Sequence, residues 1–168
     1  TFYLDAAGTS SFTADYVAIS GSMASAFVGV GSLGLTLNTV DLGILLVSDG
    51  TIQYSAISAS VGSATFTGIA GLSATATNTS LRINRTDKVG EPNAVLDFAG
   101  TGHSFSFSGT PLTLAMAASE GGLLEAKTDL VLDVFGLVSG SGTFAFKKAN
   151  GTFYLDAAGT SSFTADYV

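Results

Sequence analysis

The chain has 168 residues, of which 46% are hydrophobic and only 11% are charged, and its formal net charge at pH 7 is −7. This length allows one domain with a sizeable core, and the low charge together with 12 phenylalanines argues against a disordered chain. Six basic residues leave no basic surface for nucleic acid, and the absence of cysteine excludes disulfides and thiolate metal sites. No segment holds the roughly eighteen consecutive apolar residues that predict a membrane span.

The chain begins and ends with the same sequence. Residues 1–17 and residues 152–168 both read TFYLDAAGTSSFTADYV, at an offset of 151. This identity predicts that residues 1–151 are one repeat unit and that residues 152–168 are the start of the next unit of a tandem array. We therefore expect neighbouring copies of the same repeat to be partners of this segment.

The local patterns predict β-strands throughout. Apolar and other residues alternate over residues 12–19, 33–37 and 103–107, and glycines recur at intervals of roughly ten residues. These features predict an all-β fold, either an antiparallel, hairpin-rich two-sheet sandwich or a flattened β-solenoid repeat unit, with a right-handed parallel β-solenoid as the alternative. Residues 112–127 have some helical character, but the Gly121–Gly122 pair disfavours a helix there.

Two dipeptides predict tight turns between antiparallel strands. Asp49–Gly50 and Asn150–Gly151 each stand between alternating runs, and such pairs supply the positive φ angles of a type I′ hairpin. The second predicted hairpin crosses the repeat boundary, so we expect its residues to join consecutive units by strand pairing. These predicted junction residues are Phe144, Phe146, Asn150, Gly151, Phe153, Tyr154 and Leu155.

Charge is concentrated in residues 82–93, which read RINRTDKVGEPN. The pattern predicts an exposed loop between two strands. A solvated turn is the simpler interpretation, while a contact loop for a glycan or another surface ligand is the functional alternative. The residues that would form the contact are Arg82, Arg85, Asp87, Lys88 and Glu91.

Groups that could support catalysis are sparse. His103 is the single histidine, and one histidine without identified partners favours a structural or surface role. Asp129 and Asp133 lie four residues apart, about 13 Å along a strand, which exceeds the carboxylate separations of glycoside hydrolases. A distant pair such as Asp41 with Asp97 stays open. We predict no enzymatic activity and no cofactor.

Calcium is a minor alternative. Neither the GGxGxDxUx nonapeptide nor an EF-hand loop is present. Asp5, Asp15 and Asp49 lie near predicted turns, where a lone aspartate is usually a turn-forming residue. The sequence therefore predicts no metal site.

Residues 137–157 (LVSGSGTFAFKKANGTFYLDA) and residues 12–31 (FTADYVAISGSMASAFVGVG) place a glycine between alternating runs. This phrasing resembles the long repeats of giant secreted bacterial proteins of the adhesin and RTX-associated type. The resemblance implies an extracellular or cell-surface filament or adhesin stalk built from head-to-tail units. A module that binds cell-surface glycans and a polysaccharide-acting β-helix enzyme are the alternatives.

Overall fold

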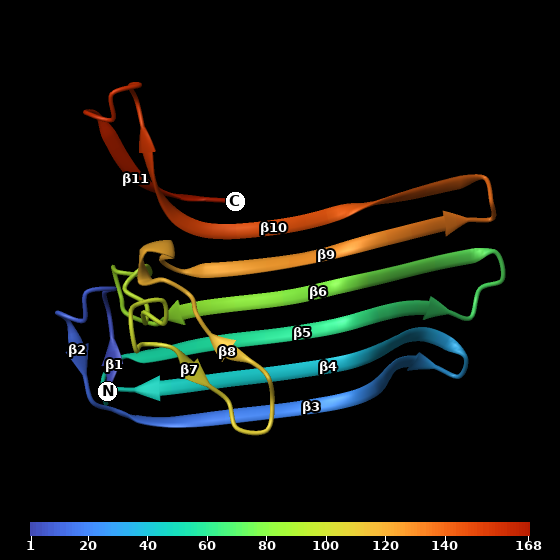
Figure 1. The fold of residues 1–168 in the computed structure, drawn as a ribbon, viewed down its shortest axis with the longest axis horizontal. Helices are drawn as coiled ribbons and strands as arrows, with labels where there is room; N and C mark the ends of the chain where they lie inside the picture. The colour runs from blue at the N-terminus through green and yellow to red at the C-terminus, as the bar shows by residue number, and fades with distance from the viewer.

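The computed structural model describes all 168 residues, and the chain is built almost entirely of β-strands (Figure 1). Seven strands form one antiparallel sheet in the order β11-β10-β9-β6-β5-β4-β3, and two short two-stranded sheets, β1-β2 and β7-β8, lie beside it. The elements are β1 (Phe2–Tyr3), β2 (Ser11–Phe12), β3 (Asp15–Val30), β4 (Leu33–Ser48), β5 (Gln53–Thr67), β6 (Leu72–Thr86), β7 (Phe105–Ser106), β8 (Thr113–Leu114), the 3₁₀ turn η1 (Ala118–Glu120), β9 (Leu123–Val134), β10 (Val138–Tyr154) and β11 (Ser162–Tyr167).

The prediction of an all-β, antiparallel fold is confirmed. Strands β3 to β6 form a meander, β9 pairs with β6, and every strand pair runs antiparallel. No parallel pair occurs, so the parallel pairing of the solenoid alternative is not found. Residues 112–127 contain β8, η1 and the start of β9 in place of a helix, and the backbone at Gly121 has a positive φ of 61°.

The predicted hairpin at Asp49–Gly50 is present, but its loop is longer than a two-residue type I′ turn. Strand β4 ends at Ser48 and β5 begins at Gln53. The Asp49 carboxylate accepts hydrogen bonds from the backbone N–H groups of Thr51 (2.9 Å) and Ile52 (2.7 Å). These bonds hold a four-residue loop, since an aspartate side chain can replace a backbone acceptor in a turn.

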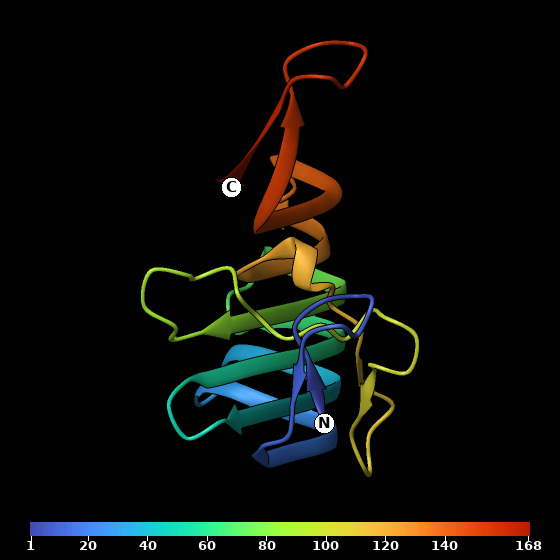
Figure 2. The same ribbon diagram turned by 90° about the vertical axis from the view of Figure 1, so that its left-hand side faces the viewer.

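The hydrophobic core lies at one end of the large sheet. Residues 87–122, between β6 and β9, fold back over this end, and we call this segment the cap (Figure 2). The sheet, the cap and the β1–β2 hairpin beside it contribute large apolar side chains to one cluster. Its buried members are Phe2, Leu45, Val47, Tyr54, Ala56, Leu96, Phe98, Phe107, Leu114, Met116, Leu123 and Ala149.

Two close contacts fix the cap on the sheet. The buried Asn84 of β6 donates a 2.7 Å hydrogen bond from Nδ2 to the carbonyl oxygen of Leu96 in the cap. At Gly43 of β4 the ring of Phe107 comes so close that a Cβ atom would lie 2.4 Å from it. Glycine is therefore required at position 43 for this aromatic side chain to reach the sheet.

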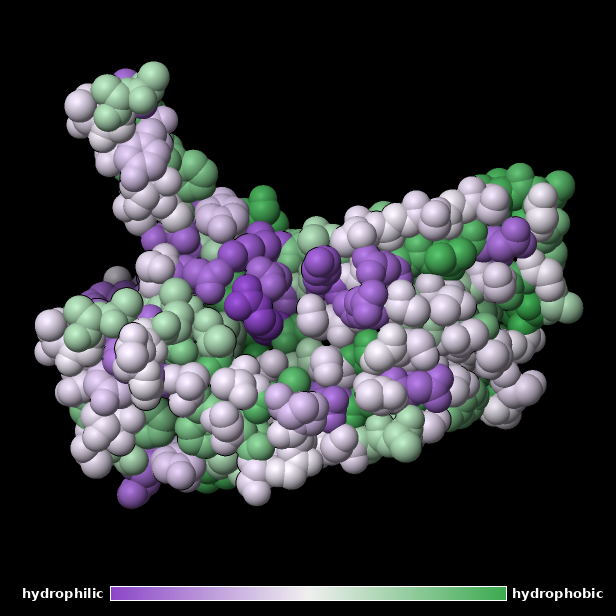
Figure 3. Space-filling model, viewed as in Figure 1, coloured by the Kyte–Doolittle hydropathy of each residue, from purple (hydrophilic) through white to green (hydrophobic).

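Beyond the cap the sheet is a single layer. Six of its seven strands are 12 to 17 residues long, yet only 19 of the 168 residues are buried. Exposed apolar side chains gather at the far turns, where Phe135, Leu137 and Val138 lie in the open (Figure 3). On the face opposite the cap, one row of directly facing residues runs Ile19, Ile44, Ile57, Ile83 and Leu124 across five strands.

Candidate functional site

The two copies of the repeated sequence fold into the same hairpin. In the N-terminal copy Phe2 faces Phe12, and in the C-terminal copy Phe153 faces Phe163, which is the same pair displaced by 151 residues. The ends of both hairpins project from the sheet at the end that carries the cap (Figure 1). Identical sequence thus gives an identical register in two different surroundings.

The loop of each hairpin is held by one aspartate. Asp5 accepts hydrogen bonds from the N–H of Thr9 (3.0 Å) and the N–H of Ser10 (2.6 Å). Asp156 accepts the corresponding bonds from Thr160 (3.0 Å) and Ser161 (2.7 Å). The hydrogen bond from the Thr160 backbone, together with those from the Thr160 side chain and the Ser161 backbone, lowers the pKa of Asp156. The loop is therefore a local structure that needs no support from the rest of the fold.

The aromatic packing inside the hairpin is repeated as well. Phe2 lies edge-on to Tyr16, with ring centroids 5.7 Å apart, and Phe153 lies edge-on to Tyr167 at 5.8 Å. The ring centroids of Phe153 and Phe163 are 5.5 Å apart. Each hairpin therefore brings its own small aromatic cluster to whatever surface it meets.

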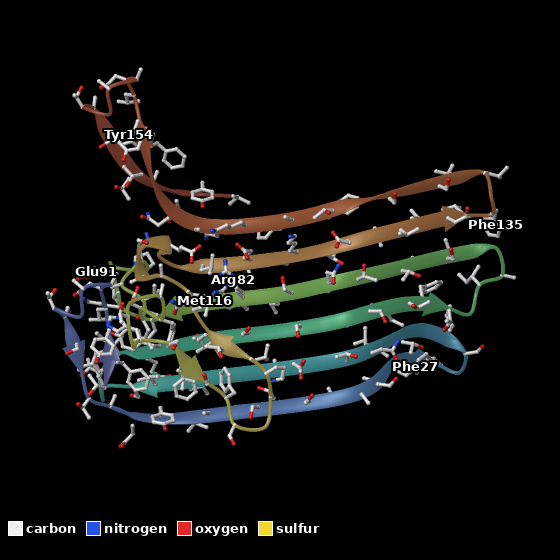
Figure 4. All side chains as sticks on the ribbon, viewed as in Figure 1. Phe27, Arg82, Glu91, Met116, Phe135 and Tyr154 are labelled. Carbon is white, nitrogen blue, oxygen red and sulfur yellow. The ribbon has the colours of Figure 1, made fainter.

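Only the N-terminal hairpin is docked. The Tyr3 ring stacks on His103 with centroids 3.8 Å apart, and the carbonyl oxygen of Tyr3 accepts a 2.7 Å bond from the N–H of Asp97. The Phe12 ring lies 5.3 Å from that of Tyr54 on β5. The C-terminal hairpin has no counterpart to these contacts, and Figure 4 shows Tyr154 on the hairpin that projects away from the sheet.

The side chains that receive the N-terminal hairpin are themselves held rigidly. Asp97 is buried and accepts bonds from the N–H groups of Ala118 (2.8 Å) and Gly100 (2.8 Å), and it is bonded to His103 Nδ1 at 2.8 Å. Burial alone would raise the pKa of Asp97, but these hydrogen bonds outweigh it and the net pKa is lowered. His103 has a structural position, as a platform for Tyr3.

Equivalent residues of the two hairpins differ sharply in their exposure to solvent. Phe2 is 7% exposed, while the identical Phe153 is 39% exposed. Leu4 packs against the core, while its equivalent Leu155 is 69% exposed. The C-terminal hairpin therefore presents an apolar surface of the same composition as the one that the N-terminal hairpin buries.

The prediction of a type I′ hairpin at Asn150–Gly151 is wrong. Both residues lie inside β10, which runs unbroken from Val138 to Tyr154, and Asn150 faces Asp166 while Gly151 faces Ala165. Gly151 serves a close approach rather than a turn, because a Cβ atom there would lie 2.9 Å from the Tyr167 ring.

The seven predicted junction residues therefore lie on one strand and the loop that follows it. Phe144 and Phe146 face β9, opposite Thr128 and Ala126, and do not pair with the later residues. Phe153 and Tyr154 face β11 instead, and Leu155 begins the exposed loop. Strand β10 thus changes partner near the repeat boundary while remaining continuous.

Sequence reasoning missed an amide–carboxylate cluster at this partner change. Asp166 accepts hydrogen bonds from Asn93 Nδ2 (2.9 Å) and Asn150 Nδ2 (3.1 Å). The bonds from Asn150 and Asn93 lower the pKa of Asp166. Asp15, the equivalent residue of the first copy, makes no such contact. No local pattern connects Asp166 with Asn93, which lies 73 residues earlier in the chain.

The predicted contact loop begins later than expected. Arg82 and Arg85 lie in β6, because this strand stays paired with β5 up to Thr86. Arg82 also binds Glu125 of β9 through two 2.9 Å hydrogen bonds. The bond to Glu125 is the main cause that raises the pKa of Arg82, and the same bond lowers the pKa of Glu125. Arg82 is thus engaged within the sheet.

A second ion pair extends this cluster to the junction strand. Lys147 of β10 binds Glu120 of η1, and its Nζ lies 3.6 Å from Glu125. The hydrophilic residues around Arg82 form a patch over the sheet in Figure 3, at the position labelled in Figure 4. The bond to Glu120 raises the pKa of Lys147. These pairs connect β6, β9, β10 and η1.

The remaining residues of the predicted loop, Asp87, Lys88 and Glu91, do not form one cluster. Asp87 accepts a 2.7 Å bond from the N–H of Gln53, and Lys88 pairs with Glu91 at 2.7 Å. Asp87 and Arg85 line an open hollow of about 510 Å³ at the ends of β3 to β6, beside Asp15 and Tyr16.

The acidic residues considered for catalysis do not come together. Asp129 is bonded to Asn78 (2.9 Å) and Thr143, and Asp133 accepts a bond from the N–H of Gly136 (3.0 Å). Asp41 is buried on β4, and Asp97 lies in the cap. No group of three or more His, Cys, Asp or Glu side chains is arranged to hold a metal ion.

Comparisons with known proteins give no family for this chain. The sequence matches no protein-family model and no curated protein, and the fold matches no solved structure. None of the elements is a helix with the length and apolarity needed to cross a membrane.

Proposed function

We propose that residues 1–151 are a structural unit of a tandem array, an extracellular filament or adhesin stalk whose consecutive units are joined by strand pairing across the repeat boundary. The observation that carries this proposal is the continuity of β10, which leaves β9 and runs into a hairpin identical in register to the one at the start of the chain. The proposal assigns the chain no catalytic role.

The exposed apolar surface of the C-terminal hairpin supports this function. Phe153, Tyr154 and Leu155 are solvent-exposed, whereas the same residues in the first copy pack on His103, Asp97 and the core. An exposed apolar patch of this kind is typical of an interaction surface. In an array, the cap of the following unit would supply the missing contacts.

This function also favours the flattened, extended repeat over a two-sheet sandwich. The long strands carry no second sheet of similar size, and only one end of them is covered. In an array each unit would cover the edge strands of its neighbours, which removes the unpaired edges that otherwise favour aggregation.

A chain of two periods, residues 1–151 followed by residues 1–168, tests the proposal by hydrogen exchange. We expect the internal copy of the seventeen-residue segment to become as protected as the N-terminal copy, while the last copy stays labile. Equal lability of the internal and last copies would contradict the proposal. The single-period chain is the matched control.

A further inference from the structure

We propose that the free edge of β10 binds strand β3 of a second copy of this chain, in a register that β11 already fixes. In the complex, the C-terminal hairpin of the first copy replaces the N-terminal hairpin of the second copy on its cap. This inference rests on the proposed function and adds to it the partner and the residue-by-residue pairing.

The register follows from the last pair that the structure contains. Ala149 faces Tyr167, and Tyr167 is the repeat of Tyr16. Continuing antiparallel from this pair sets Lys148 opposite Val17 of the second copy, Phe146 opposite Ile19, Phe144 opposite Gly21, and Val138 opposite Phe27. The free edge of β10 is residues 138–148, because residues 149–154 pair with β11. This register sets the free edge opposite residues 17–27, which all lie within β3.

At two positions of this register a large side chain faces a glycine. Phe144 is exposed, and a Cβ atom at Gly21 would meet no other atom within 4 Å, so the glycine leaves open space for the ring. Gly142 in turn falls opposite Met23, which is also exposed. Aromatic rings that cover a glycine across a strand pair occur in the same sheet, where Tyr167 covers Gly151.

The two edges lack the features that normally prevent strand addition. Between Tyr16 and Val30 of β3, and between Val138 and Phe146 of β10, there is no charged residue and no proline. Exposed edges of this length are usually interrupted by charge, proline or a bulge. The two lysines of β10, Lys147 and Lys148, fall opposite Ala18 and Val17, so no like charges face each other.

The exchange of hairpins preserves the existing contacts. Since the two copies are identical, Tyr154 of one molecule can make with His103 of the other the contact that Tyr3 now makes. Exchange of an identical element between molecules conserves the docking contacts. The new ladder between β10 and β3 is then the net gain that favours association.

Cysteine cross-linking tests the register, because the natural chain has no cysteine. A mixture of Thr143→Cys and Ser22→Cys chains should form a disulfide-linked dimer, since facing residues in an antiparallel pair have Cα atoms about 4.5–5.5 Å apart. Thr143→Cys mixed with Ala18→Cys is the control, because four residues out of register displaces the sulfurs by about 13 Å. We expect the cross-linked dimer in the first mixture and its loss in the second.

A second variant tests the hairpin exchange. Adding Phe153→Ser to the Thr143→Cys chain should abolish the cross-link, because the donor hairpin loses its apolar anchor while the core of its own molecule is untouched. Equal cross-linking in both mixtures, none in either, or no effect of Phe153→Ser would overturn the inference. Protection of the internal copy in the two-period chain, with no cross-link here, would leave the array standing and refute the association of separate copies.

Discussion

The same seventeen residues stand in two surroundings in this molecule, and the difference separates local folding from docking. Residues 1–17 and 152–168 share one hairpin register, one aspartate-held loop and one aromatic cluster. Only in the first copy do aromatic side chains pack on the rest of the fold: Tyr3 stacks on His103 of the cap, and Phe12 lies beside Tyr54 of β5. The second copy meets the cap through the hydrogen bond between Asp166 and Asn93. The hairpin is therefore specified by its own sequence, whereas its burial depends on the surface that it meets.

The sharpest test of this difference is the same truncation in each copy. Phe2→Ala should reduce the free energy of unfolding by about 3 kcal/mol, because Phe2 is almost fully buried in the core. Phe153→Ala should cost clearly less, since its ring is partly exposed and contacts only its own hairpin. Urea unfolding of the two variants measures both values. Equal losses would show that the C-terminal hairpin is docked in solution.

Gly151→Val should loosen the junction without affecting the core. The added Cβ would meet the Tyr167 ring at 2.9 Å, so we expect a local cost of about 1 kcal/mol for pairing between β10 and β11. Amide exchange of residues 162–167 should become faster. Gly21→Val, where the side chain meets open space, is the matched control. Unchanged exchange in the Gly151 variant would show that the Tyr167 ring moves aside freely.

Lowering the pH should weaken the docking of the N-terminal hairpin, and so reduce the difference in burial between the two copies. The pKa of Asp97 is lowered in the folded state by its hydrogen bonds, so its stabilising contribution is present above the ordinary carboxyl pKa of about 4 and is lost as pH falls through the lowered value. The stacking of Tyr3 on His103 should weaken in that range, as followed by Tyr3 side-chain NMR. In an Asp97→Asn variant the Tyr3 NMR signal should depend less on pH. An equally steep dependence would show that Asp97 does not cause the change.

The smallest expected effect concerns the amide–carboxylate cluster. Asp166→Ala removes the acceptor of Asn93 and Asn150, so amides in residues 162–167 should exchange somewhat faster. Asp15→Ala, the same change in the first copy, should leave these amides unchanged. A matching response to both substitutions would mean that Asn93 and Asn150 do not hold the junction.

Much of the fold could be predicted from local patterns. Alternation and glycine spacing predicted β-strands, and Asp49–Gly50 correctly indicated an antiparallel hairpin. Asn150–Gly151 misled because the same dipeptide fits an extended strand when a tyrosine ring lies over the glycine. Whether the dipeptide forms a turn or a strand depends here on Tyr167. Its ring reaches Gly151 because β10 pairs with β11, and the spacing of residues in the sequence does not show this.

The candidate site was predicted only in part. The repeat identified the two equivalent hairpins, but the docking residues Asp97 and His103 lie about a hundred residues from Tyr3 in the chain, and no local pattern connects them. Arg82 was assigned to a loop because charge usually lies on loops. Glu125, its partner across the β6–β9 ladder, shows why a charged residue can stand within a strand.

In the proposed array β11 leads into the next unit's β3, so that the sheet continues from unit to unit. Each 151-residue unit then adds six strands, β3 to β6, β9 and β10. Cryo-electron microscopy of a chain of several periods measures this directly. We expect strands perpendicular to the long axis and an axial repeat of about 29 Å, from six spacings of about 4.8 Å. Strands parallel to the axis, with a repeat near the strand length of about 50 Å, would contradict it.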